Sequence, residues 1–224
     1  MAEDDVTLFG KLKNKLIDSK QKWAEEGRLL TGKTAAHGVR LPPGQRQVET
    51  WPVLDLGVQP EIPTHAWRLF VDGAVETPTT WKWGEFTDLP KARLTSDIHC
   101  VTAWSRYDNK WEGVSARDLL ALVKPKADAK YVIFHSYDTY TTNVPLEDFA
   151  AEDVLLAWSW NGQPISREHG GPLRVVIPKL YFWKSAKWIK RVEFSAIDKP
   201  GFWEVRGYHN YGDPWLEQRY DEEI

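Results

Sequence analysis

Short apolar segments of strand length, bounded by Gly, Pro, Asn or Asp, recur from residue 67 onward and limit what the chain can fold into. Segments of this length that are rich in β-branched and aromatic residues are typical of strands. The Asn161–Gly162 pair indicates a tight turn, and Asp72–Gly73 after Trp67–Val71 predicts a hairpin with a two-residue turn. Further strands are expected at residues 131–134, 154–160, 173–177 and 189–196.

One internal helix is expected among these strands. Ser115 is a suitable N-cap, Asp118 follows three residues later, and the apolar residues from Leu119 to Val123 have helical spacing. Sheets combined with few short helices predict an α+β domain. With 224 residues, the chain is long enough for one domain with a substantial core.

The N-terminus predicts an amphipathic helix of its own. Apolar side chains, Leu8 and Leu12 among them, recur at helical spacing over residues 5–26, with charged residues between them. We therefore divide the chain into an N-terminal helix, residues 1–32, and a single domain, residues 33–224. Packing on the outside of the domain is the simple role for this helix, and docking on a membrane surface or on a partner is the alternative.

A long segment rich in Gly and Pro, residues 31–63, precedes the first expected strand. Pairs such as Pro42–Pro43 and Trp51–Pro52 disfavour both helices and regular strands. Because long ordered loops usually carry a function, we expect this segment to cross a cleft. A plain linker is the alternative.

Charge and cysteine content exclude several classes of protein. The formal net charge is −3, with 29 basic and 32 acidic residues spread along the chain, which gives no polyelectrolyte signal for nucleic acid or anionic lipid. No apolar run approaches the roughly 18 residues of a membrane span. Cys100 is the sole cysteine, so an intrachain disulfide is impossible, and no export signal is recognisable. We expect a soluble, cytoplasmic protein.

Cys100 is also the first candidate for chemistry, because it follows His99 at the end of an expected strand. It can be an inert buried thiol. A thiolate nucleophile would need a base, for which His99, His135 and His169 are candidates. A zinc site would need further ligands, and the chain has no cysteine pair and no His-x-x-His spacing. A soft metal that is already held by a sulfur-bearing cofactor would need only this thiolate, and spacing alone does not choose among these possibilities.

A second candidate site is basic and rich in Gly. His169 and Arg174 stand on either side of a Gly-Gly-Pro turn, and Lys184 and Lys187 are three residues apart. Lysine and arginine supply charge and hydrogen-bond donors for a phosphate, and backbone amides near Ser185 add donors. A solvated basic loop is the alternative.

Several segments, taken in their order along the chain, resemble one known family. They are similar to the molybdopterin domain of the sulfite oxidase family, and the resemblance runs from about residue 63 to residue 215, most of the chain. The segments are His-Cys-Val-Thr-Ala-Trp-Ser at 99–105, Tyr-Thr-Thr-Asn-Val-Pro-Leu at 140–146, Asn-Gly-Gln-Pro at 161–164, His-Gly-Gly-Pro at 169–172, the strand 174–178 and Lys-Ser-Ala-Lys-Trp at 184–188.

The resemblance implies a mixed, strand-rich α+β catalytic domain that binds a molybdenum–molybdopterin cofactor and no haem. Cys100 matches the cysteine that ligates molybdenum, and Tyr140 matches the tyrosine that faces the metal's oxo group in the sulfite oxidases proper. The segment Trp51–Leu54 falls where the family places another pterin contact, although its residues differ from the family pattern. The positions that match cofactor contacts are His99, Ser136, His169, Arg174, Lys184, Ser185, Ala186 and Lys187.

The residues that follow Cys100 bear on the substrate. Sulfite oxidases proper carry an arginine cluster there, whereas this chain has Val-Thr-Ala-Trp-Ser and its first arginine at Arg106. The bacterial protein-methionine-sulfoxide reductase branch has a similar run. The resemblance therefore implies oxygen-atom transfer at a sulfur or nitrogen centre, with a small or protein-bound sulfoxide or N-oxide as the substrate.

Two other functions stay open on the sequence. A non-catalytic molybdopterin-binding or carrier protein would hold the same cofactor without turnover. A thiol enzyme, or a binding module lined by some of the 13 tryptophans, would hold no metal. The dimerisation domain of the eukaryotic enzymes is not matched, so we expect a monomer with an unidentified electron-transfer partner, no nucleic acid and no membrane span.

Overall fold

The computed structural model describes residues 14–15, 17–19 and 40–221. Residues 14–15 and 17–19 are helical, and the rest of the helix expected over residues 5–26 lies outside the described residues. None of the helices in the described part of the chain has the length and apolar character that crossing a bilayer requires.

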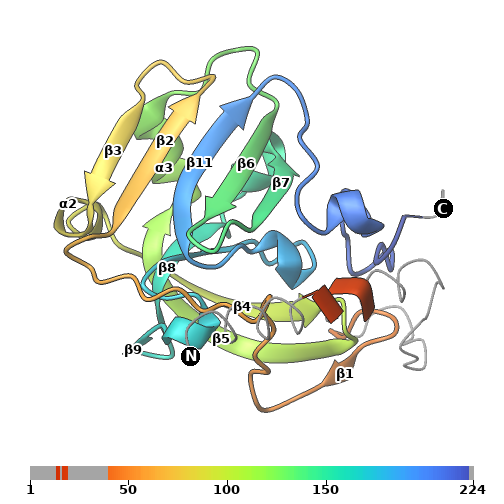
Figure 1. The fold of residues 1–224 in the computed structure, drawn as a ribbon. Helices are drawn as coiled ribbons and strands as arrows, with labels where there is room; N and C mark the ends of the chain where they lie inside the picture. The colour runs from red at the N-terminus through yellow and green to blue at the C-terminus, as the bar shows by residue number, and fades with distance from the viewer. Residues whose placement is uncertain (1–13, 16, 20–39, 222–224) are drawn as a thin grey trace, which may run out of the picture.

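Two mixed sheets form the body of the molecule (Figure 1). The first comprises β1 (Arg46–Gln47), β4 (Ala92–Cys100), β5 (Trp104–Ser115), β8 (Leu155–Trp160), β9 (Gln163–Pro164) and β10 (Arg174–Val176). The second comprises β2 (Arg68–Gly73), β3 (Thr79–Lys82), β6 (Tyr131–Ser136), β7 (Thr141–Pro145) and β11 (Ile189–Ser195). Their strand orders are β1-β5-β8-β10, with β4 paired to β5 and β9 to β8, and β3-β2-β11-β6-β7. The β1–β5 and β2–β11 pairs are parallel, which makes both sheets mixed.

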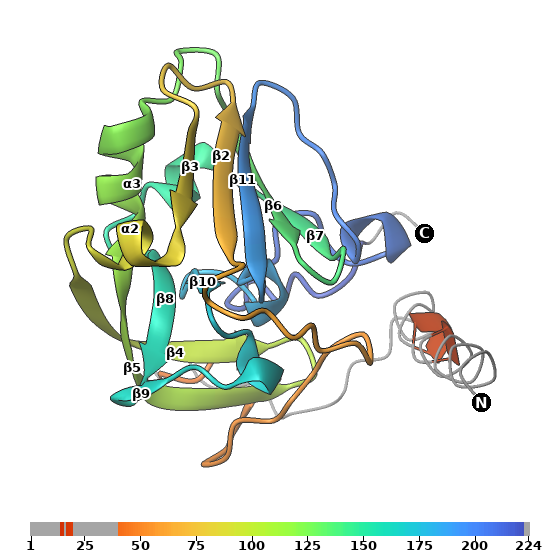
Figure 2. The same cartoon turned by 60° about the vertical axis from the view of Figure 1, so that its left-hand side comes forward.

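Short helices join the strands, and the class is the predicted α+β. The expected N-cap is confirmed, because Ser115 Oγ accepts a hydrogen bond of 3.0 Å from Asp118 N. Figure 2 shows the second sheet standing above the long β4–β5 hairpin of the first. The helices are α2 (Trp83–Thr87), α3 (Ala116–Val123) and α4 (Leu146–Phe149), and the 3₁₀ turns are η1 (Arg167–His169), η2 (Phe182–Lys184) and η3 (Glu204–Arg206).

Four of the expected strands are confirmed as β6, β8, β10 and β11. The tight turn expected at Asn161 and Gly162 is also present, and it joins β8 to β9. Both turn residues have positive φ, 50° and 80°, which asparagine and glycine adopt more readily than other residues.

The expected two-residue hairpin turn is wrong. Asp72 and Gly73 stay in β2, which pairs with β3 only as far as Val71↔Thr79. The physical reason is the parallel neighbour β11, whose Phe194 pairs with Gly73 and prolongs β2 through the predicted turn.

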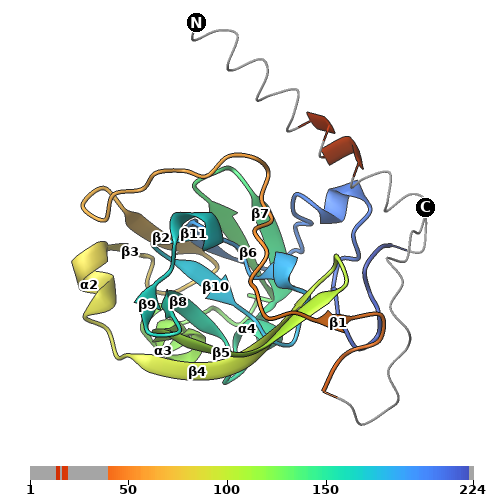
Figure 3. The ribbon, with the colours of Figure 1, turned by 90° about the horizontal axis from the view of Figure 1, so that it is seen from below.

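The hydrophobic core includes the fully buried side chains of Trp67, Trp111 and Trp188. The described part of the Gly- and Pro-rich segment, residues 40–63, contains only the short strand β1. It crosses the molecule from β1 to β2 (Figure 3). Residues of this segment line a cleft, which confirms the expected crossing.

Candidate functional site

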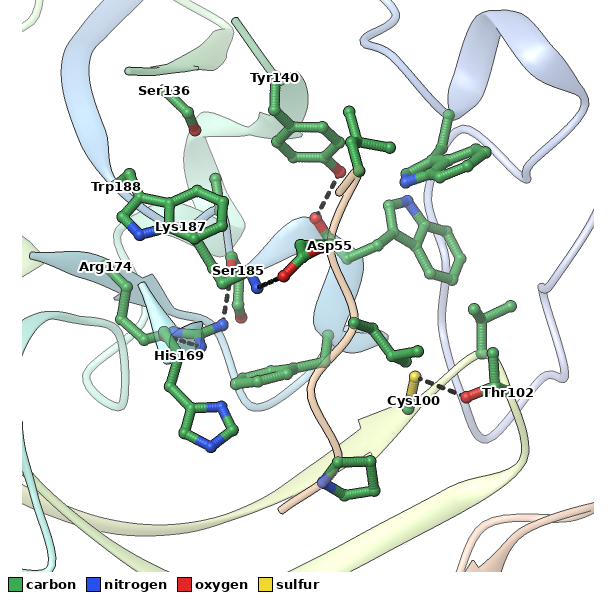
Figure 4. A pocket seen from close by; sticks show the side chains of 18 of the residues that line it. Asp55, Cys100, Thr102, Ser136, Tyr140, His169, Arg174, Ser185, Lys187 and Trp188 are labelled. Atoms are coloured by element: carbon green, nitrogen blue, oxygen red, sulfur yellow. Dashed lines mark hydrogen bonds and ion pairs between the residues drawn. The ribbon is translucent and has the colours of Figure 1, made fainter. Parts of the chain in front are cut away.

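A cleft lies beside the ends of β4 and β6, which belong to different sheets. Figure 4 shows side chains that line it. Six segments that are distant in the sequence contribute, so the cleft exists only in the folded chain. The segments lie within residues 51–56, 100–104, 136–140, 169–174, 182–188 and 203–208.

Cys100 ends β4 and lines the cleft. Its Sγ lies 3.1 Å from Thr102 Oγ1, and the residue is only 6% exposed. The chain returns into β5 through a tight turn in which Ala103 has φ 66° and donates its N–H to Cys100 O (3.1 Å). This turn fixes the thiol in the wall of the cleft.

Two buried residues brace the turn from far away in the sequence. Gln45 Nε2 donates to Cys100 O (3.0 Å), and Arg219 Nη1 donates to Val101 O (2.6 Å). They act from 55 and 118 residues away. No local pattern marks such contacts, and the sequence did not predict them.

His99, a predicted cofactor contact, belongs to the same brace. Its Nδ1 forms a hydrogen bond of 2.8 Å with Ser105 Oγ, which donates in turn to Gln45 Oε1 (3.2 Å). Burial is the main cause that lowers the pKa of His99 to about 4, so the ring is neutral at pH 7. The structure does not place His99 among the residues that line the cleft. Its contribution within the described chain is to hold the turn that carries Cys100.

Arg174 is a buried cation on another wall of the cleft. Its Nη1 donates to His169 O (2.7 Å), its Nη2 donates to Ser185 O (2.8 Å), and its guanidinium packs over the Phe182 ring at 4.1 Å. Burial lowers the pKa of Arg174 to about 9, which leaves it charged at pH 7. No carboxylate among the described residues forms an ion pair with it. A buried cation without a protein counter-ion suits an anionic ligand.

Trp51 and Asp55 bring the crossing segment into contact with the basic wall. The Trp51 ring stacks on His169, with ring centres 3.9 Å apart and planes 5° apart. Asp55 Oδ2 lies 4.0 Å from Lys187 Nζ, which donates to Glu168 O at 2.8 Å. Lys187 and His169, both predicted cofactor contacts, therefore lie together in the cleft, under the crossing segment.

Ser136 and Tyr140 line the cleft on either side of the β6–β7 connection. Ser136 Oγ is buried and has no hydrogen-bond partner among the described residues. Tyr140 Oη donates to Trp183 O at 2.8 Å. Burial, and next the charge of Glu204, raises the pKa of Tyr140 well above its ordinary value, so the phenol stays protonated.

Ser185 and Ala186 line the cleft through the loop that follows η2. The loop is fastened to the first sheet, because Ser185 Oγ accepts a hydrogen bond from Ile177 N and Ala186 O accepts one from Val175 N, both at 2.9 Å. This fixed backbone lies against Arg174, because Ser185 O accepts a hydrogen bond from Arg174 Nη2.

Lys184 does not take the predicted place. Its side chain is fully buried, and it does not line the cleft. Its Nζ lies 2.6 Å from Glu204 Oε1 and donates to Asn143 O (3.0 Å) and Asn210 O (2.6 Å). The ammonium is thus committed to an internal ion pair, and we withdraw its assignment as a cofactor contact.

The remaining residues fit a cofactor that carries its own metal ligands. No cluster of three or more His, Cys, Asp or Glu side chains able to hold a metal ion occurs in the described part of the chain. The cleft offers one thiol at Cys100, a buried cation at Arg174 and an unsatisfied hydroxyl at Ser136. A pterin dithiolene with a phosphate needs one further soft ligand for its metal and donors for its anion.

Titration of His169 predicts a loss of stability in acid. Burial, followed by the charges of Arg174 and Lys187, lowers its pKa from 6.5 to about 4. Between pH 6.5 and 4, the unfolded chain therefore binds a proton at His169 that the folded chain does not. The contribution of neutral His169 to the unfolding free energy is fully present above pH 6.5 and is lost as the pH falls toward 4. Because the ring is partly solvated, we expect a loss of about 1 kcal/mol from this group.

The measurement is urea unfolding of the cofactor-free protein and of His169→Gln across this pH range. The variant is expected to show the flatter dependence of unfolding free energy on pH. Equal slopes for the two proteins would contradict the prediction.

Comparison with known proteins identifies the domain. Residues 56–203, more than half of the chain, match the family described as the oxidoreductase molybdopterin binding domain. An uncharacterized oxidoreductase of Bacillus subtilis (strain 168), YuiH, is 47% identical over 182 residues, which cover 81% of this chain and 92% of that protein. The protein-methionine-sulfoxide reductase catalytic subunit MsrP of Ralstonia nicotianae is 27% identical over 164 residues, 66% of this chain and 49% of that protein. The chain thus spans about half the length of that second relative.

A solved structure shares the fold. The sulfane dehydrogenase SoxCD from Paracoccus pantotrophus matches with a TM-score of 0.57 and 22% sequence identity over 62% of this chain and 40% of that chain. The matched family region contains Cys100, Arg174 and the loop that ends at Lys187. The cleft therefore belongs to a molybdopterin-binding oxidoreductase domain, and the chain is a member of the oxidoreductase molybdopterin binding domain family.

Proposed function

We propose that the protein is a molybdenum oxidoreductase that removes an oxygen atom from an uncharged sulfoxide or N-oxide. The observation that carries the proposal is the uncharged, aromatic wall beside Cys100. It is formed by Val101, Thr102, Trp104, Trp203 and Tyr208. An aromatic wall of this kind suits a neutral, partly apolar oxo compound better than a small anion.

The charges of the cleft lie elsewhere. Figure 4 shows Arg174 and Lys187 on the side away from Cys100 and Thr102. Arg106, the first arginine after the cysteine, bonds to Asn109 Oδ1 and Glu49 O, and it does not line the cleft. A sulfite anion would therefore meet no arginine beside Cys100 among the described residues that line the cleft.

The residues divide the work between binding and chemistry. When bound, the cofactor supplies a metal that exchanges an oxygen atom with the substrate's sulfur or nitrogen. Cys100 would ligate that metal, while Arg174, Lys187 and Ser136 would bind the pterin phosphate. The raised pKa of Tyr140 keeps its hydroxyl protonated, and this hydroxyl donates a hydrogen bond to Trp183 O. The tryptophans that line the cleft would limit the access of water to the reacting atoms.

The test is a turnover assay on protein purified from a host that makes the molybdenum cofactor. Reduced benzyl viologen supplies electrons, and methionine sulfoxide and trimethylamine N-oxide are offered as acceptors. Sulfite oxidation is measured separately with an artificial oxidant. Turnover of at least one neutral acceptor, faster than turnover of sulfite, is expected. Sulfite oxidation alone would overturn the substrate class, and a loaded protein with no turnover of any of them would indicate a cofactor carrier.

Lys187→Ala is expected to weaken retention of the cofactor. A charge-assisted phosphate contact contributes about 1.5–3 kcal/mol, so affinity should fall roughly tenfold to a hundredfold. The readout is pterin and molybdenum per chain after extended gel filtration. Lys190→Ala is the matched control, because this nearby lysine is exposed and does not line the cleft. Equal retention by the two variants would contradict a phosphate role for Lys187.

The electron donor, the cytoplasmic location and the monomeric state stay predictions. The methionine sulfoxide reductase named above is matched over about half of its length, so its activity supports the proposed substrate class only as that of a relative.

A further inference from the structure

We propose that Glu204, whose charge the buried ion pair with Lys184 balances, is a positioning residue that holds Trp183 and, through it, Tyr140 in the lining of the cleft. The Trp183 ring lies 5.2 Å from the ring of Tyr208, which belongs to the uncharged wall beside Cys100. The inference rests on the proposed function, because Tyr140 and Trp183 line the cleft in which that reaction would occur. The pair itself lies outside the lining of the cleft, so its two residues would act through other side chains.

Glu204 gathers three donors on one oxygen. Its Oε1 accepts hydrogen bonds from Thr142 Oγ1 (2.8 Å) and Trp183 Nε1 (2.9 Å) and lies 2.6 Å from Lys184 Nζ. Its Oε2 is buried without a hydrogen-bond partner among the described residues. Because every interaction converges on Oε1, the position of that atom sets the position of the donors around it.

Three segments meet at this carboxylate. Glu204 belongs to η3, and Trp183 and Lys184 belong to η2. Thr142 belongs to β7, the strand that begins directly after Tyr140. Phe182 and Trp183 of η2 line the cleft, as do Tyr140 and Trp203, which directly precede β7 and η3. Glu204 therefore joins η3 to η2 through the ion pair and to the second sheet through Thr142 Oγ1.

Trp183 is held at both ends. Its indole N–H donates to Glu204 Oε1, while its carbonyl oxygen accepts the hydroxyl proton of Tyr140 at 2.8 Å. The indole also stacks on Tyr181, with ring centres 5.3 Å apart and planes 18° apart. Release of the indole would allow the Trp183 backbone to shift, and with it the carbonyl oxygen that accepts the Tyr140 proton.

Lys184 balances the negative charge of Glu204. Burial lowers its pKa, and the carboxylate of Glu204 opposes that effect. Asn143 and Asn210 supply the remaining acceptors for its ammonium. The lysine thus neutralises Glu204 at a depth where a lone carboxylate would be costly, and Glu204 can then serve as an acceptor for Trp183.

The experiment compares two double variants of the holoenzyme that both lack the ion pair. Lys184→Met/Glu204→Leu removes the charges and the acceptor, whereas Lys184→Met/Glu204→Gln removes the charges but keeps an amide oxygen for Trp183. The first is expected to lower kcat for methionine sulfoxide about tenfold with unchanged molybdenum per chain, since small displacements of a group at the reacting centre have effects of this size. The glutamine variant should recover most of that loss.

Tyr140→Phe shows whether the pair acts through the tyrosine. In that background, Lys184→Met/Glu204→Leu should cost little further kcat, because the hydroxyl that it displaces is already missing. An equal loss in both backgrounds, or an equal loss for the leucine and glutamine variants, would overturn the proposal. Lys199→Met is the control, because it breaks a 2.5 Å ion pair with Glu193 whose two residues do not line the cleft.

A spectroscopic arm separates this proposal from the proposed function. With 5-fluorotryptophan incorporated, the ¹⁹F resonance of Trp183 is identified by its loss in Trp183→Phe. It should shift in the leucine variant and return toward its wild-type position in the glutamine variant. An unchanged resonance would overturn the positioning role, whatever the activity shows. If wild-type protein reduces no sulfoxide, the proposed function fails and this arm alone decides the positioning role.

The wild-type protein provides the test if the leucine variant does not fold. The indole N–H of Trp183 donates to a buried carboxylate, so it should exchange slowly with deuterated solvent. Rapid exchange of that proton would overturn the proposal without any variant.

Discussion

Replacement of Cys100 by serine should reduce sulfoxide turnover roughly a thousandfold or more, because removal of a group at the reacting centre commonly lowers kcat by this much. The thiolate is a soft metal ligand, whereas a serine hydroxyl is harder and does not ionise near neutral pH. The serine side chain fits the same space, and its Oγ can bond to Thr102 as the sulfur does now. We therefore expect the fold to persist, at a cost of about 1–2 kcal/mol in unfolding free energy.

The measurement pairs turnover with pterin content and thermal unfolding of Cys100→Ser. Pterin should be retained, because Arg174 and Lys187 are untouched, while the absorption spectrum of the bound metal changes. Thr102→Val is the control for the lost contact to sulfur, and it should show a far smaller loss of turnover. A folded serine variant with wild-type activity would disprove the role of Cys100 as metal ligand.

Arg174→Met should remove most of the cofactor from the purified protein. The change deletes a buried cation and its hydrogen bonds, the two shortest of which go to His169 O and Ser185 O. The two carbonyl oxygens are left without these donors, which adds a stability cost of about 2–4 kcal/mol. We expect pterin and molybdenum per chain to fall to roughly a tenth or less, because a buried charge-assisted phosphate contact is among the stronger polar contacts.

Two further variants separate loss of the cofactor from loss of the fold. Arg106→Met removes an arginine that packs over the Trp160 ring at 4.8 Å and does not line the cleft, and it should retain the cofactor. Arg174→Lys keeps the charge without the planar donor pair and should retain an intermediate amount. Full cofactor content in a stable Arg174→Met protein would show that the phosphate is bound elsewhere.

The sequence predicted most of the features that depend on neighbouring residues. Ser115 and Asp118 form their cap within one turn of helix, and Asn161–Gly162 forms its turn within one hairpin. Cys100 likewise lies at the end of a strand, as its local context indicated. Such features are set by backbone preferences and hydrophobic periodicity, which a short window of sequence contains.

Features that depend on distant partners were missed or misplaced. The parallel strand β11 prolongs β2 through Gly73, and the sequence near Gly73 does not predict this pairing. Gln45 and Arg219 brace the cysteine turn from both ends of the described domain.

Lys184 shows the same limit within a recognised motif. It stands three residues from Lys187 in a basic loop, yet Glu204 turns its ammonium inward, while Lys187 lines the cleft. A motif gives the residue types near a phosphate. The direction of each side chain depends on what the rest of the fold places beside it.

The central claim is that this cleft holds a molybdenum cofactor through Cys100, and the cofactor content of the wild-type protein tests it most directly. Molybdenum would be measured by elemental mass spectrometry and the released, oxidised pterin by its fluorescence, on protein from a host that makes the cofactor. We predict about one molybdenum and about one pterin per chain. A folded protein from that host with neither metal nor pterin would contradict the claim.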